Sequence, residues 1–291
     1  MERSCRRIFF VCSPDARPRD KGGFHYQTRD SGNTFNYHHL MAFALRSVDL
    51  FNLTKDVLNL SNMAPIIDAR DLSRVYSLGD SEVVGLNRVS LTIAPGEMVV
   101  LKGNSGSGKS TLLSLLAGLD EPSGGCLHVA GYDLQDLSET QKNSYRRKVV
   151  GMIFQAFNLL PTMSVMENVC LPALLAGNPY RATMERAREL LDWLEMGSRC
   201  GHRPAQLSGG EMQRTAIARS LINNPALILA DEPTGNLDSR NGGLVIELLR
   251  ELNRRWQRTV IIATHSNLAD PFATLQICLK DGALTDSTCD L

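Results

Sequence analysis

The stretch that decides the fold reads Gly103-Asn104-Ser105-Gly106-Ser107-Gly108-Lys109-Ser110, with Thr111 directly after it. A glycine, four further residues and then Gly-Lys-Ser is the spacing of a phosphate-binding loop. The apolar run Met98–Leu101 predicts a strand before the loop, and clustered leucines predict a helix after it. A chance Gly- and Ser-rich turn is the alternative, and this context argues against it.

The chemistry of this loop suits a nucleotide. Its glycines let successive backbone N–H groups curl around a polyphosphate, and the following helix adds the positive end of its dipole. Lys109 supplies a charge for the β- and γ-phosphates, and the Ser110 hydroxyl is a ligand for Mg²⁺. We therefore expect residues 103–111 to bind a nucleotide together with Mg²⁺.

Short apolar runs alternate with helical patterns over much of the chain. Leu227–Ala230 and Val260–Ala263 are continuously apolar, as expected of strands buried on both faces of a parallel sheet. Apolar residues recur at helical spacing in Arg181–Met196 and in Leu244–Leu252. This alternation predicts an α/β fold.

Two acidic residues follow the first of these apolar runs. Asp231 and Glu232 would lie at the carboxyl end of a strand, where ligands bind in open α/β sheets. Acids often end strands merely for solubility, but beside a phosphate loop the pair predicts a nucleotide site. We expect Asp231 to hold Mg²⁺ and Glu232 to act as general base toward the attacking water.

The sequence Ser208-Gly209-Gly210-Glu211 precedes another predicted helix. Ser208 and Glu211 have the spacing of a capping box, which would explain them structurally. A capping box does not by itself require the two glycines, and bare glycines expose the first N–H groups of a helix to an anion. The pattern favours an anion-binding helix start over a plain cap.

The 291-residue chain is electrically balanced, with 31 basic and 31 acidic residues. A protein that coats nucleic acid normally has a basic excess, so we expect no nucleic-acid partner. No uninterrupted apolar run approaches the roughly 20 residues that a membrane-spanning helix needs. Transport across a membrane would therefore require a path built by another chain.

Residues 1–62 differ from the rest of the sequence. Ser13–Asn36 mixes Pro, Gly, Arg, Asp and Asn without periodicity or motif. We expect 1–62 to be an extension that is either disordered or produced by translation starting upstream of Met63. The regular patterns begin at Ile66, so the folded domain is expected over residues 63–291.

The phosphate loop, the Ser208-Gly209-Gly210 signature and the Asp231-Glu232 pair, in this order, resemble the ATP-binding cassette of ABC transporters. The resemblance covers residues 66–285. It implies an α/β phosphate-loop NTPase core that binds ATP and Mg²⁺, with two additions: a small antiparallel β subdomain, near 66–100 and 125–132, and a helical subdomain near 157–220.

The same resemblance assigns roles to further residues. Gln155 resembles the Q-loop glutamine, which senses Mg²⁺ and the attacking water. His265 resembles the switch histidine that contacts the γ-phosphate, and Tyr76 fits the A-loop aromatic that stacks on adenine. Gly235-Asn236-Leu237-Asp238 is similar to the D-loop. Two positions depart from the family pattern, since Ser266 stands where Asp is usual and Met212 where a polar residue is usual.

In this family two cassettes face each other head to tail, and each ATP lies between the phosphate loop of one and the signature of the other. The resemblance therefore implies a homodimer that drives two integral membrane permease subunits from the cytoplasmic face of the inner membrane. Phe157–Thr162 and the segment Ala230–Asp238 are similar to the group of lipoprotein-releasing (LolD-type), macrolide-export and cell-division (FtsE-type) ATPases.

Within that group, His202-Arg203-Pro204 followed by Gln206-Leu207-Ser208 is most similar to the lipoprotein-releasing member. That similarity implies LolC/LolE-like permease partners and a lipoprotein as the load, with macrolide export and cell division as alternatives. A soluble ABC ATPase of DNA repair would carry zinc-finger insertions or coiled coils, and a translation-factor type would carry two cassettes. The sequence shows neither feature.

Overall fold

The computed structural model describes residues 64–79 and 81–285. In this part of the chain, a four-stranded antiparallel sheet has the order β2-β1-β4-β5. Its strands are β1 (Ile67–Leu78), β2 (Ser81–Ile93), β4 (Gly124–Val129) and β5 (Tyr132–Asp133). The expected antiparallel subdomain is confirmed.

The second sheet has six strands in the order β10-β9-β3-β8-β7-β6. It contains β3 (Met98–Lys102), β6 (Val150–Ile153), β7 (Leu227–Asp231), β8 (Thr259–Ala263), β9 (Leu275–Lys280) and β10 (Ala283–Leu284). All neighbouring pairs are parallel except β9 with β10. The run at 98–100, expected near the antiparallel subdomain, thus belongs to the parallel core.

Apolar side chains alternate between two cores on opposite faces of this sheet. Val100, Ile228 and Ile262 belong to one core, with the helices between residues 165 and 256. Their strand neighbours Leu101 and Leu229 belong to the other, with the antiparallel sheet and the leucines at 112–116. Both faces of β3, β7 and β8 are therefore dry, which explains why their sequences are continuously apolar.

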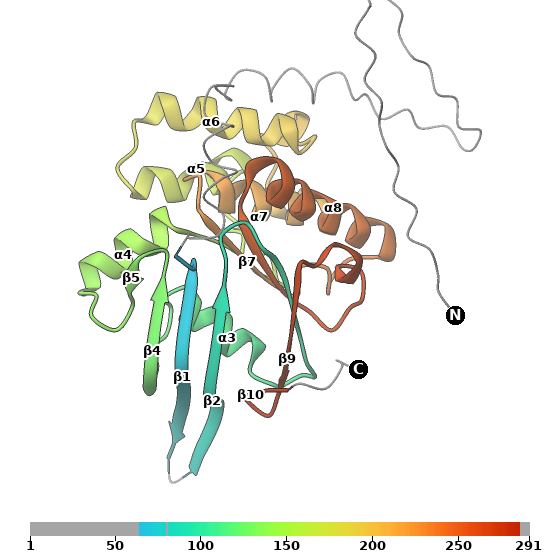
Figure 1. Cartoon of the computed structure of the whole chain (residues 1–291). Helices are drawn as coiled ribbons and strands as arrows, with labels where there is room; N and C mark the ends of the chain where they lie inside the picture. Colours follow the sequence, from blue (N-terminus) through green and yellow to red (C-terminus); the bar gives the residue numbers. More distant parts are fainter. Residues whose placement is uncertain (1–63, 80, 286–291) are drawn as a thin grey trace, which may run out of the picture. The chain divides into compact units, whose positions relative to one another are not determined.

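Helices pack against both faces of the six-stranded sheet (Figure 1). They are α3 (Lys109–Leu116), α4 (Glu139–Lys148), α5 (Val165–Leu175), α6 (Tyr180–Trp193), α7 (Gly209–Leu221) and α8 (Ser239–Trp256). Helix α5 packs against α6 and α7, which confirms the helical subdomain. None of the helices in the described ranges is long and apolar enough to cross a bilayer.

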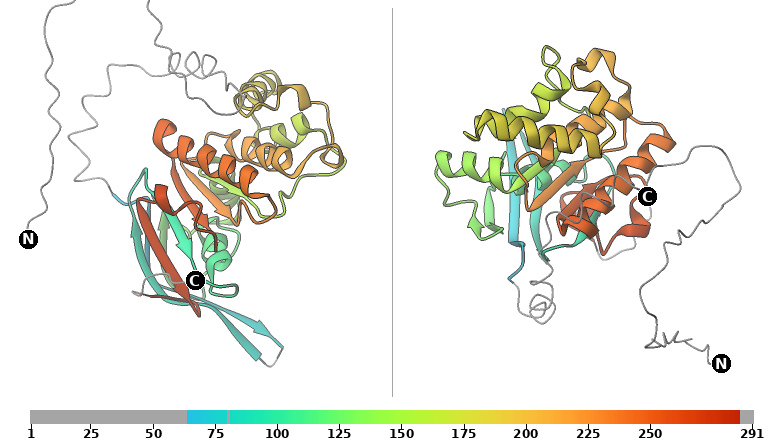
Figure 2. Two further views of the ribbon diagram at one scale, coloured as in Figure 1. Left: turned by 90° about the vertical axis from the view of Figure 1, so that its right-hand side faces the viewer. Right: turned by 90° about the horizontal axis from the view of Figure 1, so that it is seen from above.

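Two elements differ from the sequence expectation. The sequence alternates apolar and polar residues in Ile66–Leu72 and Val89–Ile93, which predicts two short strands there. The β1–β2 hairpin extends well past both segments, and it projects away from α5 and α6 (Figures 1 and 2). Its outer part is exposed, so no apolar alternation marks it in the sequence. In α8, Leu244 is 39% exposed, and Ile246 joins the buried face in its place.

Candidate functional site

The carboxyl ends of three adjacent parallel strands form the floor of one cavity. Strand β3 runs into the phosphate loop, β7 ends at Asp231, and β8 pairs Ala263 with Asp231 before the chain continues to His265. The cavity has a volume of about 740 Å³. It is lined by Tyr76, Val83, Val84, Gly85, Asn104, Ser105, Gly106, Gly108, Lys109, Ser110, Thr111, Gln155, Asp231, Glu232 and His265.

The phosphate loop depends on glycine at two positions in particular. Gly103 has φ 154° and Gly108 has φ 102°. A Cβ at Gly103 would lie 2.3 Å from the carbonyl oxygen of Leu279, and one at Gly108 would lie 2.5 Å from that of Gly85. Any side chain at either position would therefore collide with backbone that cannot move aside.

Lys109 and Ser110 begin helix α3. Lys109 is buried, and its Nζ donates to the carbonyl oxygens of Gly103 (2.7 Å) and Asn104 (3.0 Å). The ammonium is thereby fixed inside the curve of the loop. A buried cation and a helix N-terminus together favour an anion at this position.

Ser110 and Asp231 form a pair of hard oxygen groups. The Ser110 hydroxyl donates to Asp231 Oδ1 at 3.2 Å. Burial raises the pKa of Asp231 above its usual range, while the hydrogen bond from Ser110 acts in the opposite direction. A divalent cation at this pair would stabilise the charged carboxylate, and Mg²⁺ prefers such oxygen ligands. The residues present thus fit the metal expected from the sequence.

Glu232 is held in an unusual backbone conformation beside Asp231. Its φ is 45°, in the left-handed region, and its N–H donates to the carbonyl oxygen of Ala263 at 2.8 Å. Its carboxylate accepts a hydrogen bond from Thr264 Oγ1 at 3.2 Å and lies 2.9 Å from His265 Nδ1. Thr264, which sequence reasoning missed, thus orients one carboxylate oxygen while His265 contacts the other.

Gln155 lines the same cavity, next to the predicted D-loop. Its carbonyl oxygen accepts a hydrogen bond from Asn236 Nδ2 at 2.8 Å. A Cβ at Gly235 would lie 2.9 Å from Gln155 Nε2, so glycine there makes room for the glutamine side chain. The two segments expected from the family resemblance are therefore in contact.

Tyr76 also lines the cavity, from strand β1. The neighbouring wall comes from β2, where Val83 and Val84 are about half exposed (48% and 52%) and Gly85 follows them. Nothing in the sequence marked these three residues, because exposed valines at the outer part of a hairpin have no distinctive pattern.

The signature segment lies outside this cavity, since none of Ser208, Gly209 and Gly210 lines it. Ser208 caps α7. Its N–H and Oγ donate to Glu211 Oε2 at 2.8 and 2.9 Å, and the Glu211 N–H donates back to Ser208 Oγ at 3.3 Å. The pKa of Glu211 is lowered to about 2. The hydrogen bond from the Ser208 N–H makes the largest contribution to this shift, and the hydrogen bond from Arg199 makes the next largest.

The structure supplies a packing reason for one of the two signature glycines. A Cβ at Gly210 would lie 2.7 Å from Asn241 Oδ1 at the start of α8. A Cβ at Gly209 would lie 3.3 Å from the flexible end of Leu237 and at an ordinary contact distance of 3.6 Å from the carbonyl oxygen of Asn236. The capping box is therefore present, and Gly210 is explained by helix packing, whereas Gly209 is not.

Ser266, the departure from the usual Asp, takes part in a turn that a buried lysine holds. The Ser266 N–H donates to Thr264 Oγ1 at 3.0 Å, and its Oγ accepts from the Leu268 N–H at 3.3 Å. Lys102 is only 2% exposed, and its Nζ donates to Ser266 O at 2.9 Å and pairs with Asp270 at 2.8 Å. Lys102 thus fixes the segment that follows His265.

Comparisons with known proteins agree with this geometry. Residues 86–235 match the family model described as ABC transporter. The macrolide export ATP-binding/permease protein MacB of Rhodospirillum rubrum is 47% identical over 224 residues, which are 77% of this chain and 34% of MacB. The chain thus spans about a third of the length of that relative.

Other relatives are covered almost completely. The lipoprotein-releasing system ATP-binding protein LolD of Pseudomonas fluorescens is 44% identical over 70% of this chain and 90% of LolD. An uncharacterized ABC transporter ATP-binding protein of Methanocaldococcus jannaschii is 42% identical over 76% of this chain and 98% of its own length.

A solved dimeric ATP-binding cassette, in a post-hydrolysis state with ADP and phosphate, has the same fold. It is 38% identical, with a TM-score of 0.70, over 75% of this chain and 96% of the cassette. Together with the phosphate loop and the acidic pair at the ends of parallel strands, these similarities identify the family. The chain belongs to the ABC transporter ATP-binding proteins, in the group that contains MacB and LolD.

Proposed function

We propose that two copies of this chain form a head-to-tail homodimer that hydrolyses ATP at shared sites and thereby drives lipoprotein release through separate membrane subunits. One observation carries the shared-site part. The phosphate loop, Asp231, Glu232 and His265 line one cavity, while the signature Ser208–Gly210 does not reach it. A second copy supplies the signature that the cavity lacks within one chain.

The phosphate loop and Tyr76 bind the two parts of ATP. The N–H groups of residues 103–111 and the Lys109 ammonium hold the phosphates, and Tyr76 stacks on the adenine ring. Ser110, Asp231 and Gln155 would hold Mg²⁺, whose charge would offset the negative phosphate oxygens. The contact between Ser110 and Asp231 at 3.2 Å supports this assignment.

Hydrolysis then depends on Glu232 and His265. A Glu232 carboxylate oxygen accepts a proton from the attacking water, while Thr264 and His265 keep the carboxylate oriented. His265 is exposed at the cavity, so its imidazole is available to the γ-phosphate. The positive end of α7 in the partner adds a further charge opposite the same phosphate.

A second cavity supports a contact with membrane subunits. It has a volume of about 340 Å³, and one of the residues that line it is Phe154, the neighbour of Gln155 in sequence. Its other walls include Leu171 and Leu175 of α5 and Met152 of β6. A permease segment seated here would contact the backbone neighbour of a cavity-lining glutamine, and the ATPase would lie peripherally on the cytoplasmic face of the inner membrane.

The lipoprotein assignment rests on His202-Arg203-Pro204 and the following Gln206-Leu207-Ser208. In the structure these residues shape the entry to α7. The Arg203 N–H donates to Gln206 Oε1 at 2.8 Å, and His202 O accepts from the Val165 N–H of α5 at 2.8 Å. Macrolide export is the second candidate, because the MacB relative is 47% identical and LolD is 44% identical.

The test is to purify the chain with its native membrane partners, using Glu232→Gln to keep the complex in its ATP-bound form. Two membrane subunits are expected. In proteoliposomes, the complex with the unsubstituted chain should release a membrane-anchored lipoprotein when ATP is added. Failure to release lipoprotein, with efflux of a macrolide instead, would overturn the substrate assignment but leave the ATPase assignment intact.

A further inference from the structure

Tyr76 is clamped by charged residues that do not themselves reach the cavity. The guanidinium of Arg74 lies over the Tyr76 ring, 4.6 Å from its centroid. The Tyr76 hydroxyl donates to Asp120 Oδ2 at 2.9 Å. Neither Arg74 nor Asp120 lines the nucleotide cavity, whereas Tyr76 does. Their contact with the nucleotide cavity is therefore indirect, through the tyrosine ring.

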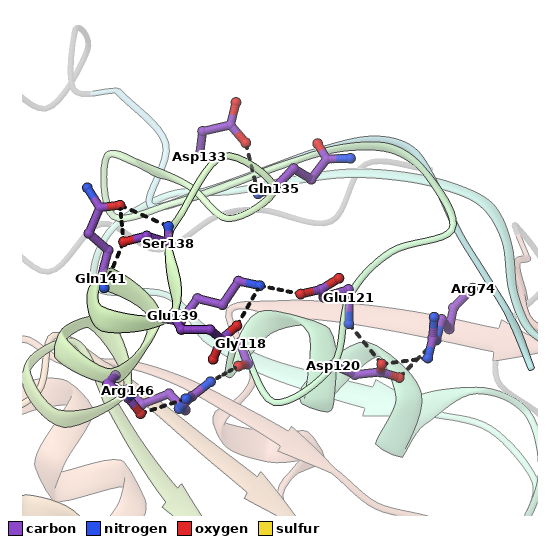
Figure 3. A network of polar contacts seen from close by, with 12 residues as sticks. Arg74, Gly118, Asp120, Glu121, Asp133, Gln135, Ser138, Glu139, Gln141 and Arg146 are labelled. Atoms are coloured by element: carbon purple, nitrogen blue, oxygen red, sulfur yellow. Dashed lines mark hydrogen bonds and ion pairs between the residues drawn. The ribbon is translucent and has the colours of Figure 1, made fainter.

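Asp120 is fixed by donors on both of its oxygens. Arg74 Nη2 lies 2.7 Å from Oδ1, and Arg74 Nε donates to Oδ2 at 2.9 Å, which makes the ion pair bidentate. The N–H of Glu121 donates to Oδ1 at 2.8 Å, and Figure 3 shows this arrangement. The side chains of Arg74 and Asp120 are only 24% and 22% exposed. The pair is therefore a rigid support rather than a mobile surface contact.

The edge of the ring is restrained as well. A Cβ at Gly85 would lie 2.8 Å from Tyr76 Cε2 and 3.1 Å from Thr111 of the phosphate-loop helix. Glycine on β2 thus lets the tyrosine ring fit closely against the strand beside the loop. With Arg74 on one face, Asp120 at the hydroxyl and Gly85 at an edge, the opposite face of the ring is the one left for a base.

We propose that Arg74 and Asp120 are positioning residues that hold Tyr76 for adenine, so that Arg74, Tyr76 and the base form a three-layer stack. This inference rests on the proposed adenine contact of Tyr76. A ring that is already oriented loses less rotational freedom on binding, so more of the stacking energy appears as affinity. The guanidinium also interacts favourably with the face of the ring that it covers.

The chain offers a matched control on the same strand. Asp68 and Arg70 form another bidentate pair on β1, with distances of 3.2 and 2.7 Å. Asp68 is 21% exposed, similar to Asp120, and neither Asp68 nor Arg70 lines the cavity. Asp68→Asn therefore removes an equivalent charge from β1 without touching Tyr76.

The experiment measures the dissociation constants of ATP and of inorganic triphosphate for the full chain by calorimetry. Triphosphate has no base, so it reports on the phosphate loop alone. Tyr76→Ala should weaken ATP binding roughly 5- to 150-fold, the range of base–aromatic stacking. Asp120→Asn and Arg74→Met should weaken it about fivefold, with triphosphate binding changed less than about twofold. Asp68→Asn should change neither.

Kinetics and a double substitution separate positioning from general damage. Asp120→Asn should raise the KM for ATP and leave kcat within about twofold. In a Tyr76→Ala chain, Asp120→Asn should have no further effect on ATP affinity. Equal weakening of ATP and triphosphate, or additive effects in the double variant, would overturn the inference. If Tyr76→Ala itself spared ATP binding, the proposed adenine contact would fail instead.

Discussion

The negative charge of Glu211, at the start of α7, should stabilise the folded chain through its contacts at the start of the signature helix. Its carboxylate accepts two hydrogen bonds from Ser208 and one from Arg199 Nε at 2.8 Å. These contacts lower its pKa from 4.5 to about 2. Without solvent screening, this shift would correspond to about 3 kcal/mol of folding free energy. Arg199 is 43% exposed, so solvent screens the ion pair. We expect Glu211→Gln to cost about 1–2 kcal/mol at pH 7.

The pH dependence follows from the direction of this shift. A lowered pKa means that the folded chain favours the carboxylate, so its contribution is complete above pH 4.5 and is lost as pH falls toward 2. The stability difference of about 1–2 kcal/mol between the unsubstituted chain and Glu211→Gln should therefore shrink by more than about half between pH 7 and pH 3.5. Urea denaturation followed by circular dichroism at both pH values measures it.

Helix α5 supplies the control, because Ser164 and Glu167 form the same capping box, and Arg203 acts on Glu167 only as a nearby charge rather than through a hydrogen bond like that of Arg199 to Glu211. Ser164 N–H and Oγ donate to Glu167 Oε2 at 2.7 and 2.8 Å. Glu167→Gln should cost less than Glu211→Gln. Equal losses for the two variants, or a Glu211→Gln difference that stays constant down to pH 3.5, would refute the reasoning about Arg199 and the Glu211 pKa.

Three further predictions concern catalysis, the domain boundary and a buried charge. Glu232→Gln should reduce phosphate release about 10²- to 10⁴-fold while ATP binding persists, and residual activity above about a tenth would reject it as general base. A chain starting at Met63 should keep its melting temperature and its hydrolysis rate, because β1 starts at Ile67; a clear loss of either would contradict the proposed boundary. Lys102→Met should lower the free energy of unfolding, measured by urea denaturation, by about 2–3 kcal/mol. This loss is smaller than for a fully buried ion pair because the Asp270 side chain is 30% exposed, and a loss below about 1 kcal/mol would contradict the anchoring role of Lys102.

The core of the fold could be predicted because strands that are buried on both faces of a sheet have continuously apolar sequences. Leu227–Ala230 and Val260–Ala263 lie in central strands for that reason. The phosphate loop was equally visible, since Gly103 and Gly108 have no tolerable replacement. The β1–β2 hairpin beyond residue 72 was not visible, because exposed strands held by backbone hydrogen bonds need no particular side-chain pattern.

The supports of the site were harder to predict than its reacting groups. Tyr76 and Asp120 are 44 residues apart in sequence, and neither residue type indicates the other. Gly210 resembled an anion-binding feature, although contact with Asn241 of α8 also requires it to be small. Such contacts arise only when separate elements pack, so no local pattern records them. The boundary at residues 1–62 lies outside the described residues and stays a prediction.

The central claim is that each hydrolytic site is shared between two chains, and the structure selects the variants that test it. Lys109→Ala removes the buried ammonium from the phosphate loop. Gly209→Asp adds a negative charge at the signature, where the tightest contact of the new Cβ is with the movable end of Leu237. At Gly210 the same change would collide with Asn241, so that position is avoided. Each variant alone breaks both sites of its homodimer.

The decisive measurement is the ATPase rate of a mixture of the Lys109→Ala and Gly209→Asp chains. In the mixed dimer, one site carries both substitutions and the other carries neither. Hydrolysis should therefore return on mixing, up to about a quarter of the normal rate if the chains pair at random and the intact site works alone. A Gly209→Asp chain that hydrolysed ATP normally without a partner would contradict the shared site, and the signature would then be only a helix cap.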